Sequence, residues 1–260
     1  YETEVMEQQL REAGYQIVPF APGADVYVIN TCSVTNVADR KSRQMLHRAK
    51  KMNPGAVIVA AGCYVQTAVE RTGLAVEADI ILGNNQKKDL ILALEEYERE
   101  QKNRRISRVI DINHTGEYEE MFLNRTGEHT RAYLKVQDGC NQFCSYCVIP
   151  YARGRARSRR PEEVTEELKQ LAENGVKEVV LTGIHLSSYG TDLGTGLTDL
   201  ILRVHEIEGI RRIRLGSLEP GIVTEEFAKT LAGLEKFCPH FHLSLQSGCD
   251  TVLRRMNRRY

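Results

Sequence analysis

The chain has 260 residues, of which 35 are basic and 35 acidic, so its formal net charge is zero. This balance gives no overall attraction to nucleic acid, and no apolar run reaches the roughly 18 residues of a membrane span. Hydrophobic residues make up 42% of the chain, which is enough for real cores, and the length suits two domains. The first residues show neither a basic segment nor an apolar signal core, so we expect a soluble protein of the cytoplasm.

Both ends of the sequence lie within predicted helices. The helical pattern "YETEVMEQQLREAG" begins at Tyr1 without a methionine, and the chain stops at "RRMNRRY", just after another helix begins. We therefore expect the chain to be a fragment of a longer protein.

Residues 1–100 alternate amphipathic helical patterns with apolar, β-branched runs. Such alternation is typical of a parallel sheet flanked by helices. We expect this block to be an α/β domain of flavodoxin-like type. Helices are expected at about 2–13, 36–52, 64–71 and 87–100, and strands at 25–31, 56–62 and 78–83.

The polar, aperiodic segment 101–130 is expected to be a linker, after which the alternation resumes in residues 131–260. Four more βα units follow, and four units form half or more of a (β/α) barrel, so we expect a partial barrel. The functional ends of both blocks are then the loops that follow the strands. Strands are expected at 131–137, 178–183, 212–217 and 241–246, and helices at 161–174, 196–208, 223–234 and from about 249.

Five of the seven cysteines follow predicted strands. Cys140, Cys144 and Cys147 lie in the loop after the first strand of the second block, within "DGCNQFCSYCVIP". Cys32 follows the run "VYVINT", and Cys63 follows "AVIVAAG". Because parallel strands end at one edge of a sheet, we expect the thiols of Cys32 and Cys63 to converge.

Several kinds of site could use three thiols at spacings of four and three. Structural disulfides are typical of secreted proteins, and the sequence gives no sign of secretion. A structural zinc site usually has four ligands in paired short spacings, and no partner pair lies nearby. Inert, buried cysteines are the usual explanation of a single thiol, but they fit three in a polar loop poorly. An iron–sulfur cluster remains the interpretation that the triplet fits.

A four-iron cluster held by three thiolates leaves one iron with an open coordination position, where an exogenous ligand can bind. The three-ligand count therefore indicates a catalytic cluster, in contrast to an electron carrier. The pattern C-x3-C-x2-C with an aromatic residue, Tyr146, before its last cysteine resembles the radical S-adenosylmethionine superfamily. That resemblance implies a [4Fe-4S] cluster at Cys140, Cys144 and Cys147, with S-adenosylmethionine as a further cofactor.

The resemblance narrows to the methylthiotransferases and extends over nearly the whole chain. It implies an N-terminal domain in which three cysteines hold a second [4Fe-4S] cluster, a radical barrel and a C-terminal RNA-binding TRAM domain. Cys32 and Cys63 match two of the three ligands, the third would precede Tyr1, and no TRAM segment is part of this sequence. The stretches that carry the resemblance are "VINTCSVT" at 28–35, "AAGCYVQ" at 60–66, "GCNQFCSYCVIPYARGRARSR" at 139–159, "LTGIHLSSYG" at 181–190, "GSLEP" at 216–220 and "LSLQSGCDTVLRRMNRRY" at 243–260.

Three branches of that family differ in substrate. The stretches "LTGIH…YG" and "PYARG" resemble most closely the branch that acts on N6-threonylcarbamoyladenosine of tRNA. The other two branches act on isopentenyladenosine of tRNA and on an aspartate of a ribosomal protein. An iron–sulfur electron-transfer protein and a zinc-stabilised RNA-binding module are the alternatives from other classes.

The resemblance also implies the order of the chemistry. One-electron reduction of the radical cluster would cleave S-adenosylmethionine to a 5′-deoxyadenosyl radical. That radical would take hydrogen from C2 of the modified adenosine at tRNA position 37, in the anticodon loop, so the cofactor carries the hard step. The second cluster, at Cys32 and Cys63, would supply sulfur, which a second S-adenosylmethionine methylates. A one-electron reductant and a sulfur donor are the further partners that this chemistry requires.

Further residues at predicted strand ends are candidate cofactor contacts. Main-chain groups at Gly183 would meet the methionine amino group of S-adenosylmethionine, although a glycine there can also simply turn the chain after a strand. His185 could act as an acid, contact the substrate or be a satisfied loop histidine. The remaining candidates, beside Tyr146, are Ser217, Glu219, Gln246 and Ser247.

A basic run beyond the triplet, "ARGRARSRR", is the candidate RNA contact. Its arginines could bind phosphates, with an affinity that falls as salt rises. The alternative is a solvated surface with ion pairs to the acidic residues between 162 and 167. Residues 39–51, "DRKSRQMLHRAKK", are expected to be the exposed face of a helix. The predicted RNA-binding residues are Arg153, Arg155, Arg157 and Arg159.

Overall fold

The computed structural model describes residues 1–69, 76–100, 104–124 and 131–260. These residues form two compact units. The first unit comprises Glu2–Thr115 together with Tyr151–Gly154, and the second comprises Tyr1, Gly116–Pro150 and Arg155–Tyr260. Among the helices in the described ranges, none is long and apolar enough to cross a membrane.

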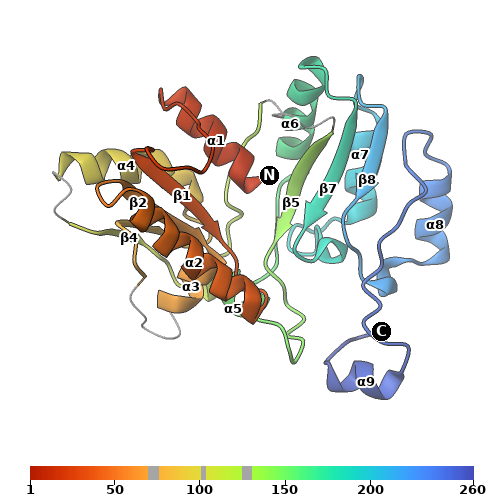
Figure 1. Cartoon of the computed structure of the whole chain (residues 1–260). Coiled ribbons are helices and arrows are strands. Elements are labelled where there is room, and N and C mark those ends of the chain that lie inside the picture. The colour runs from red at the N-terminus through yellow and green to blue at the C-terminus, as the bar shows by residue number, and fades with distance from the viewer. Residues whose placement is uncertain (70–75, 101–103, 125–130) are drawn as a thin grey trace. The chain divides into compact units, whose positions relative to one another are not determined.

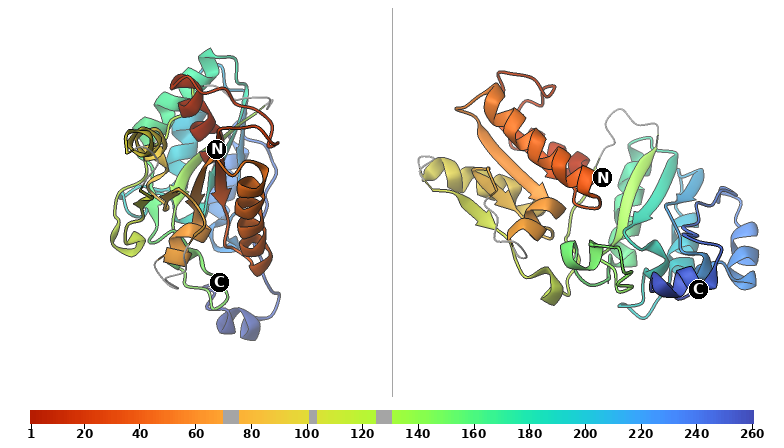
Figure 2. Two further views of the ribbon diagram at one scale, coloured as in Figure 1. Left: turned by 60° about the vertical axis from the view of Figure 1, so that its left-hand side comes forward. Right: turned by 60° about the horizontal axis from the view of Figure 1, so that its bottom comes forward.

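The first unit is built on a parallel sheet with the strand order β1-β2-β3-β4 (Figure 1). Helices α1 and α4 lie on one face of this sheet and α2 lies on the other (Figures 1 and 2). The strands are β1 Val26–Thr31, β2 Val57–Gly62, β3 Ile80–Leu82 and β4 Ile106–Arg108, and the helices are α1 Glu2–Glu12, α2 Asn36–Met52, α3 Cys63–Thr67 and α4 Leu90–Arg99, with 3-10 turns η2 Lys87–Asp89 and η3 Ile112–His114.

Local sequence explains the elements that support the strand ends. All six residues of β2 are buried, because helices cover both faces of the sheet, and this accounts for its uninterrupted apolar run. Helix α2 begins after Thr35, whose hydroxyl accepts a hydrogen bond of 3.0 Å from the backbone N–H of Ala38. Lys50 and Lys51 lie in its last turn, where cations interact favourably with the helix dipole.

The segment expected to be a linker contributes a strand to the first unit. β4 pairs in parallel with β3 and aligns Ile106 with Ile80. Three residues in a polar stretch carry too little alternation to reveal a strand, but burial of Ile106 completes this edge of the sheet. Residues 101–103 and 125–130 of that segment lie outside the described residues, as does the end of the helix predicted at 64–71.

The second unit contains a mixed sheet with the strand order β6-β5-β7-β8, in which only β6 runs antiparallel to its neighbour. This is the arrangement of a partial (β/α) barrel, and it confirms the predicted α/β fold class. The strands are β5 Ala132–Asp138, β6 Arg157–Ser158, β7 Glu178–Gly183 and β8 Arg212–Leu215, and the helices are α5 Ile149–Ala152, α6 Pro161–Glu173, α7 Leu197–His205, α8 Glu225–Ala232 and α9 Asp250–Arg255, with 3-10 turns η4 Leu186–Ser188 and η5 Pro220–Ile222.

The strand predicted at 241–246 is not formed as a continuous element. Its backbone joins the sheet through one isolated parallel bridge, between Leu218 and Leu243. Pro239 lacks a backbone donor just before the segment, and Gln246 ends it with a left-handed φ of 61°. The alternating apolar residues that predicted the strand remain largely exposed, so they lack the burial that stabilises a strand.

A buried ion pair fixes the start of α6. Arg159 Nη1 donates to Glu167 Oε2, and both side chains are almost entirely buried. The backbone N–H of Leu123 donates to Glu167 Oε1 at 3.0 Å, and the Tyr1 hydroxyl lies 3.3 Å from Oε2. Removal of either residue would leave the other as a buried charge without a partner, which is strongly destabilising. Both residues are therefore needed for the stability of this unit.

The variant Glu167→Ala is expected to lower the free energy of unfolding by about 3–5 kcal/mol, because Arg159 stays buried without its partner. Chemical denaturation of the native protein, followed by circular dichroism, measures this difference. The matched control is Glu166→Ala on the same helix, which should change stability by less than about 0.5 kcal/mol because Glu166 is exposed. Equal stabilities of the two variants would contradict the assignment.

Candidate functional site

The register of the first sheet brings two of the predicted cysteines together. Thr31 at the end of β1 is aligned with Gly62 at the end of β2, so Cys32 and Cys63 each follow an aligned pair. Neighbouring strands are about 4.8 Å apart. The expectation that these thiols meet at one sheet edge thus rests on the observed strand pairing. Cys63 is buried, whereas Cys32 is exposed.

Two contacts fix the backbone at this edge. Gly62 has a φ of 99°, and a Cβ atom there would lie 2.8 Å from the carbonyl oxygen of Thr31, so only glycine fits. The hydroxyl of Ser42 on α2 accepts from the N–H of Cys32 at 3.0 Å and lies 3.0 Å from its carbonyl oxygen. The loop that carries Cys32 is therefore tied to α2.

The three-cysteine loop, residues 139–147, follows β5 in the second unit. Cys140 and Cys144 are buried and Cys147 is half-buried. The backbone N–H of Gln142 points at Cys140 Sγ over 3.4 Å, and the N–H of Cys147 donates to the carbonyl of Cys144 at 2.9 Å. These two contacts turn the backbone back on itself after Cys140 and after Cys144.

The end of α9 clamps this loop from outside. Asn257 Nδ2 donates to the carbonyl oxygens of Gln142 and Phe143, at 2.9 and 3.1 Å. These contacts hold Phe143 in a left-handed conformation with φ 50°, which is rare for a bulky residue. The guanidinium of Arg155 lies over the Phe143 ring, 4.6 Å from its centroid.

Burial raises the pKa of two of these thiols, and their neighbours change it further. Burial raises the pKa of Cys140, and the nearby thiols Cys144 and Cys147 raise it further. Burial also raises the pKa of Cys144, while the positive charge of Arg258 lowers it. Metal binding would remove the protons of these thiols.

Glu219 connects three segments around the loop. Its carboxylate accepts from Gln142 Nε2 at 3.1 Å, pairs with His185 Nε2 at 3.0 Å and pairs with Arg258 Nη1 at 3.3 Å. The other terminal nitrogen of Arg258 donates to the Tyr146 hydroxyl at 2.9 Å. The structure thus brings together the predicted residues Tyr146, Glu219 and His185 and adds Arg258 and Gln142, which the sequence did not single out.

Gln137 joins the three-cysteine loop to the end of β7. Its buried side chain donates through Nε2 to the carbonyls of Asp138 and Gly139 and accepts through Oε1 from the N–H of His185. A Cβ atom at Gly183 would lie 2.9 Å from Gln137 Cβ and Oε1. Close packing against Gln137 therefore explains why Gly183 is glycine, whatever its main chain binds.

Two of the predicted cofactor contacts have other neighbours. The Ser217 hydroxyl lies 2.7 Å from His242 Nδ1, and both residues are exposed. Gln246 is exposed as well and takes the left-handed φ of 61°. A role for Ser217 or Gln246 in holding a cofactor remains a proposal.

The basic run is largely internal, and the burial of its arginines bears on the prediction of four phosphate contacts. Arg157 is 1% exposed, lies 3.9 Å from Asp138 Oδ2 and donates to the carbonyl of Arg155. Arg159 is held by Glu167, and Arg153 pairs with Glu2 at 3.0 Å. Only Arg155 of the four is exposed. The sequence does not reveal which of these arginines are buried beside an acidic partner, so it predicts that all four are available to phosphates.

The three loop cysteines supply thiols, the donor type that iron–sulfur clusters use. No three His, Cys, Asp or Glu side chains of the described residues converge to the spacing that one ion requires. In a cubane each thiolate binds a different iron, so the sulfur atoms need only surround a shared volume. All seven cysteines are free thiols.

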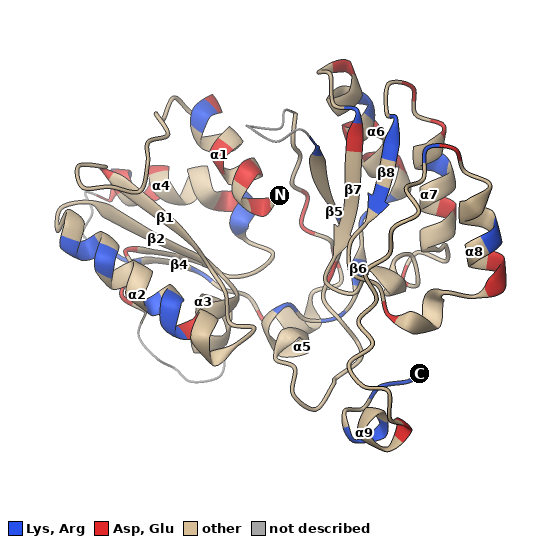
Figure 3. Cartoon of the chain, turned by 45° about the vertical axis from the view of Figure 1, so that its right-hand side comes forward, with Lys and Arg blue, Asp and Glu red and all other residues tan. Residues whose placement is uncertain are grey.

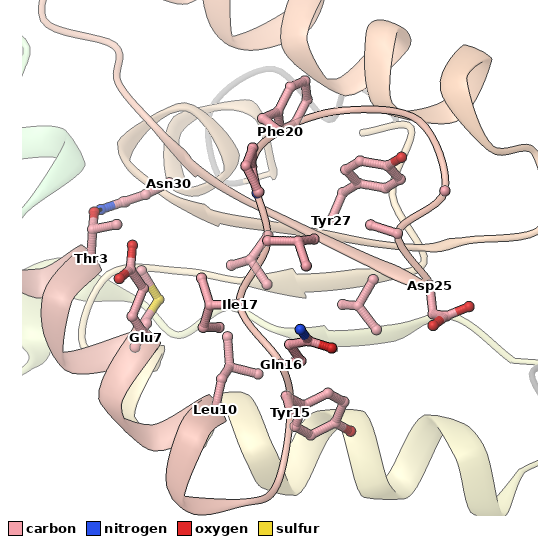
Figure 4. A pocket seen from close by; sticks show the side chains of 17 residues that line it. Thr3, Glu7, Leu10, Tyr15, Gln16, Ile17, Phe20, Asp25, Tyr27 and Asn30 are labelled. Carbon is pink, nitrogen blue, oxygen red and sulfur yellow. Dashed lines mark hydrogen bonds between the residues drawn. The ribbon is translucent and has the colours of Figure 1, made fainter.

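A cavity of about 550 Å³ lies elsewhere in the first unit, beside β1. Figure 4 shows its lining side chains from α1, from the segment after it and from β1, and Asn30 Nδ2 donates to Thr3 Oγ1 at 3.1 Å across one end. None of the cysteines lines it.

Two families of known proteins match this chain. Residues 134–260 match the radical SAM superfamily, and residues 1–83 match the family described as uncharacterized protein family UPF0004. Threonylcarbamoyladenosine tRNA methylthiotransferases of Aquifex aeolicus and Bacillus subtilis are each 43% identical over 100% of this chain. The chain belongs to the radical S-adenosylmethionine methylthiotransferases. It spans 63% and 58% of the length of those two relatives.

Other relatives carry the same family signal with a different printed substrate. The tRNA-2-methylthio-N(6)-dimethylallyladenosine synthase of Moorella thermoacetica is 36% identical over 100% of the chain and 59% of its own length. The radical S-adenosylmethionine methyltransferase TsrM of Kitasatospora setae is 16% identical with a TM-score of 0.62, covering 97% of this chain and 57% of that one, which supports the fold alone. Family membership implies a [4Fe-4S] cluster and S-adenosylmethionine as cofactors.

The charge of Arg258 should control how readily the three-cysteine loop takes up iron. Arg258→Met removes the cation that lowers the pKa of Cys144, so that pKa rises further and the iron-binding thiolate forms only at higher pH. Anaerobic iron incorporation, measured across about pH 6 to 9, should therefore shift to higher pH in this variant.

The control is Arg259→Met, which removes an exposed neighbouring charge. Its loading profile should match that of the parent protein. A parent-like profile for Arg258→Met would contradict the role given to Arg258.

Proposed function

We propose that the protein containing this chain inserts a methylthio group at C2 of N6-threonylcarbamoyladenosine, at position 37 of tRNA. The observation that carries the proposal is the three-cysteine loop at the end of β5, in a chain whose 43% identical relatives bear that activity in their names. The dimethylallyladenosine enzyme of Moorella thermoacetica is more distant, at 36%. Substrate choice rests on short loops, so an assay with modified tRNA decides the branch.

Cys140, Cys144 and Cys147 would hold the first [4Fe-4S] cluster and leave one iron open for the amino and carboxylate groups of S-adenosylmethionine. When bound, these cofactors supply one-electron cleavage of the sulfonium, which can activate an otherwise inert C–H bond. The protein's own contribution is to hold the three thiolates, exclude water from Cys140 and Cys144 and keep the positive charge of Arg258 nearby.

Glu219 would serve as a fixed anchor beside the open iron. Its contacts to His185, Gln142 and Arg258 leave it little freedom to rotate, so any cofactor group that it meets is met at a defined place. Gly183 would add main-chain groups at the end of β7. Tyr146 would add a contact to the cofactor, and its hydroxyl is held by Arg258.

Cys32 and Cys63 would provide two of the three ligands of a second [4Fe-4S] cluster, which supplies the sulfur. Cys32 is exposed and Cys63 is buried, so Cys32 would hold its part of the group where solvent and substrate can reach it. A one-electron reductant and a sulfur donor complete the list of partners that the chemistry requires.

Helix α2 offers a basic surface for the RNA. Arg40, Lys41, Arg43 and Lys51 are exposed on it, and Asp39 is its only acidic residue (Figure 3). The helix is tied to the Cys32 loop through Ser42. Phosphates bound along α2 would therefore be held at a fixed distance from the second cluster, a role that the buried arginines of the basic run cannot fill.

The test of the proposed function is anaerobic reconstitution of the full-length protein with iron and sulfide, followed by mass spectrometry of tRNA nucleosides. With S-adenosylmethionine and a reductant, a methylthio mass gain is expected on threonylcarbamoyladenosine. A gain on isopentenyladenosine would instead move the protein to the other tRNA branch. Formation of 5′-deoxyadenosine without any tRNA product would point to another substrate, such as a ribosomal protein.

Two substitutions separate the roles of the clusters in that assay. Cys144→Ala should abolish cleavage of S-adenosylmethionine, because only two ligands of the first cluster remain. Cys63→Ala should leave cleavage intact and stop sulfur insertion. Unchanged tRNA product in either variant would refute the corresponding assignment.

The triple variant Arg40→Gln, Lys41→Gln and Arg43→Gln is expected to bind tRNA more weakly. The negative slope of log affinity against log salt concentration should become shallower, by roughly 0.9 or somewhat less for each phosphate that the protein no longer neutralises. Filter binding of the full-length protein at several salt concentrations gives both values. A double variant with Arg203→Gln and Lys229→Gln removes exposed charges from α7 and α8 as the control and should retain the parent's slope.

A further inference from the structure

Asn84 stands in line with the two cysteines of the first unit. Because Ala61 of β2 is aligned with Leu82 of β3, Cys63 and Asn84 each lie two residues beyond an aligned pair. The three neighbouring strands β1, β2 and β3 are thus followed by Cys32, Cys63 and Asn84. Asn84 is fully buried, and its Nδ2 lies 3.5 Å from Cys63 Sγ and 2.6 Å from the carbonyl oxygen of Ala152.

The orientation of the Asn84 amide is fixed by its neighbours. Lys87 Nζ lies 2.8 Å from Asn84 Oδ1, and an ammonium group can only donate, so the atom facing it must be the carbonyl oxygen. The Ala152 carbonyl can only accept, so the atom facing it must be the amide nitrogen. Both constraints direct the NH₂ group toward Cys63. The backbone N–H of Asn84 is held as well, by Gln66 Oε1 at 2.8 Å.

The group behind Asn84 carries a net positive charge. Lys87 is fully buried and pairs with Glu2 Oε2 at 2.8 Å, while Arg153 pairs with Glu2 Oε1 at 3.0 Å. Two cations and one carboxylate leave one formal positive charge in this group of three. Burying a lysine is costly unless its partners are well placed, and structural support alone would be met by apolar side chains of similar size.

A hydrogen bond to a ligating sulfur has a defined physical effect. Reduction adds negative charge to a cluster and its thiolates, so a donor aimed at the sulfur stabilises the reduced form more than the oxidised form. Such outer contacts also orient the ligand. A residue that merely satisfies buried polar groups would not change the balance between the two oxidation states.

We propose that Asn84, held in place by Lys87, is a positioning residue that donates a hydrogen bond to the Cys63 sulfur and raises the reduction potential of the second cluster. This inference rests on the proposed function, because it requires a cluster at Cys32 and Cys63. Asn84, which follows β3, would thus adjust the reduction potential of the cluster that Cys32 and Cys63 hold.

The test uses the full-length protein with Cys140, Cys144 and Cys147 replaced by Ala, so that the second cluster alone contributes to the signal. Asn84→Leu keeps the volume of the side chain roughly constant, adds no charge and cannot donate to the sulfur. Its midpoint potential, from a dithionite titration followed by electron paramagnetic resonance, should be more negative than that of the parent. Lys87→Met leaves Asn84 in place without its positive partner and should shift the potential in the same direction.

The control is Asn53→Leu, which removes another amide-to-carbonyl hydrogen bond of the first unit, to Ala24. It should leave the potential unchanged. A parent-like potential in Asn84→Leu, with iron content per chain equal to the parent's, would overturn the inference and leave the proposed function standing. If the parent, which lacks Cys140, Cys144 and Cys147, binds no iron, both this inference and the second cluster of the proposed function are overturned. Iron analysis therefore tells the two failures apart.

Discussion

Parallel strand register is the constraint on which this chain depends. A parallel sheet delivers the carboxyl ends of its strands to one edge, and loops from that edge can approach a common point without long excursions. In the first unit the alignment of Thr31 with Gly62 sets Cys32 beside Cys63. In the second unit, β5 and β7 run parallel and their following loops are joined by Gln137. Every further contact at either edge builds on that alignment.

The two edges share an electrostatic design. Each sets a fixed cation behind partly buried sulfur: Arg258 beside Cys144 in one case, and Lys87 behind Asn84 in the other. In both, a carboxylate holds the cation in place, Glu219 for Arg258 and Glu2 for Lys87. Anionic thiolates in a low-dielectric region need such compensation, although the charge of Glu219 opposes it by raising the pKa of Cys144. Both arrangements lie at the ends of parallel strands, but they are built from unrelated residues.

Sequence reasoning captured what periodicity and residue spacing encode. The amphipathic patterns located α2 and α6 to within about two residues, and the cysteine spacing indicated the correct family. It did not reveal β4 or β6, whose two or three residues carry no usable period. It also treated Arg157 and Arg159 as surface charges, because a buried ion pair depends on partners that folding brings close. Asn84 and Arg258 escaped notice for the same reason: their significance lies in what they face.

Membership of Tyr151–Gly154 in the first unit has a consequence for the order of synthesis. The Ala152 carbonyl accepts from Asn84, and Arg153 pairs with Glu2, so these four residues complete a polar interior that otherwise comes from the first 115 positions. A ribosome makes them only after the three-cysteine loop. The N-terminal unit therefore cannot close its interior ahead of the rest of the chain, as vectorial folding would ordinarily allow. The cysteines of both edges are consequently on the nascent chain before the interior of the N-terminal unit is finished.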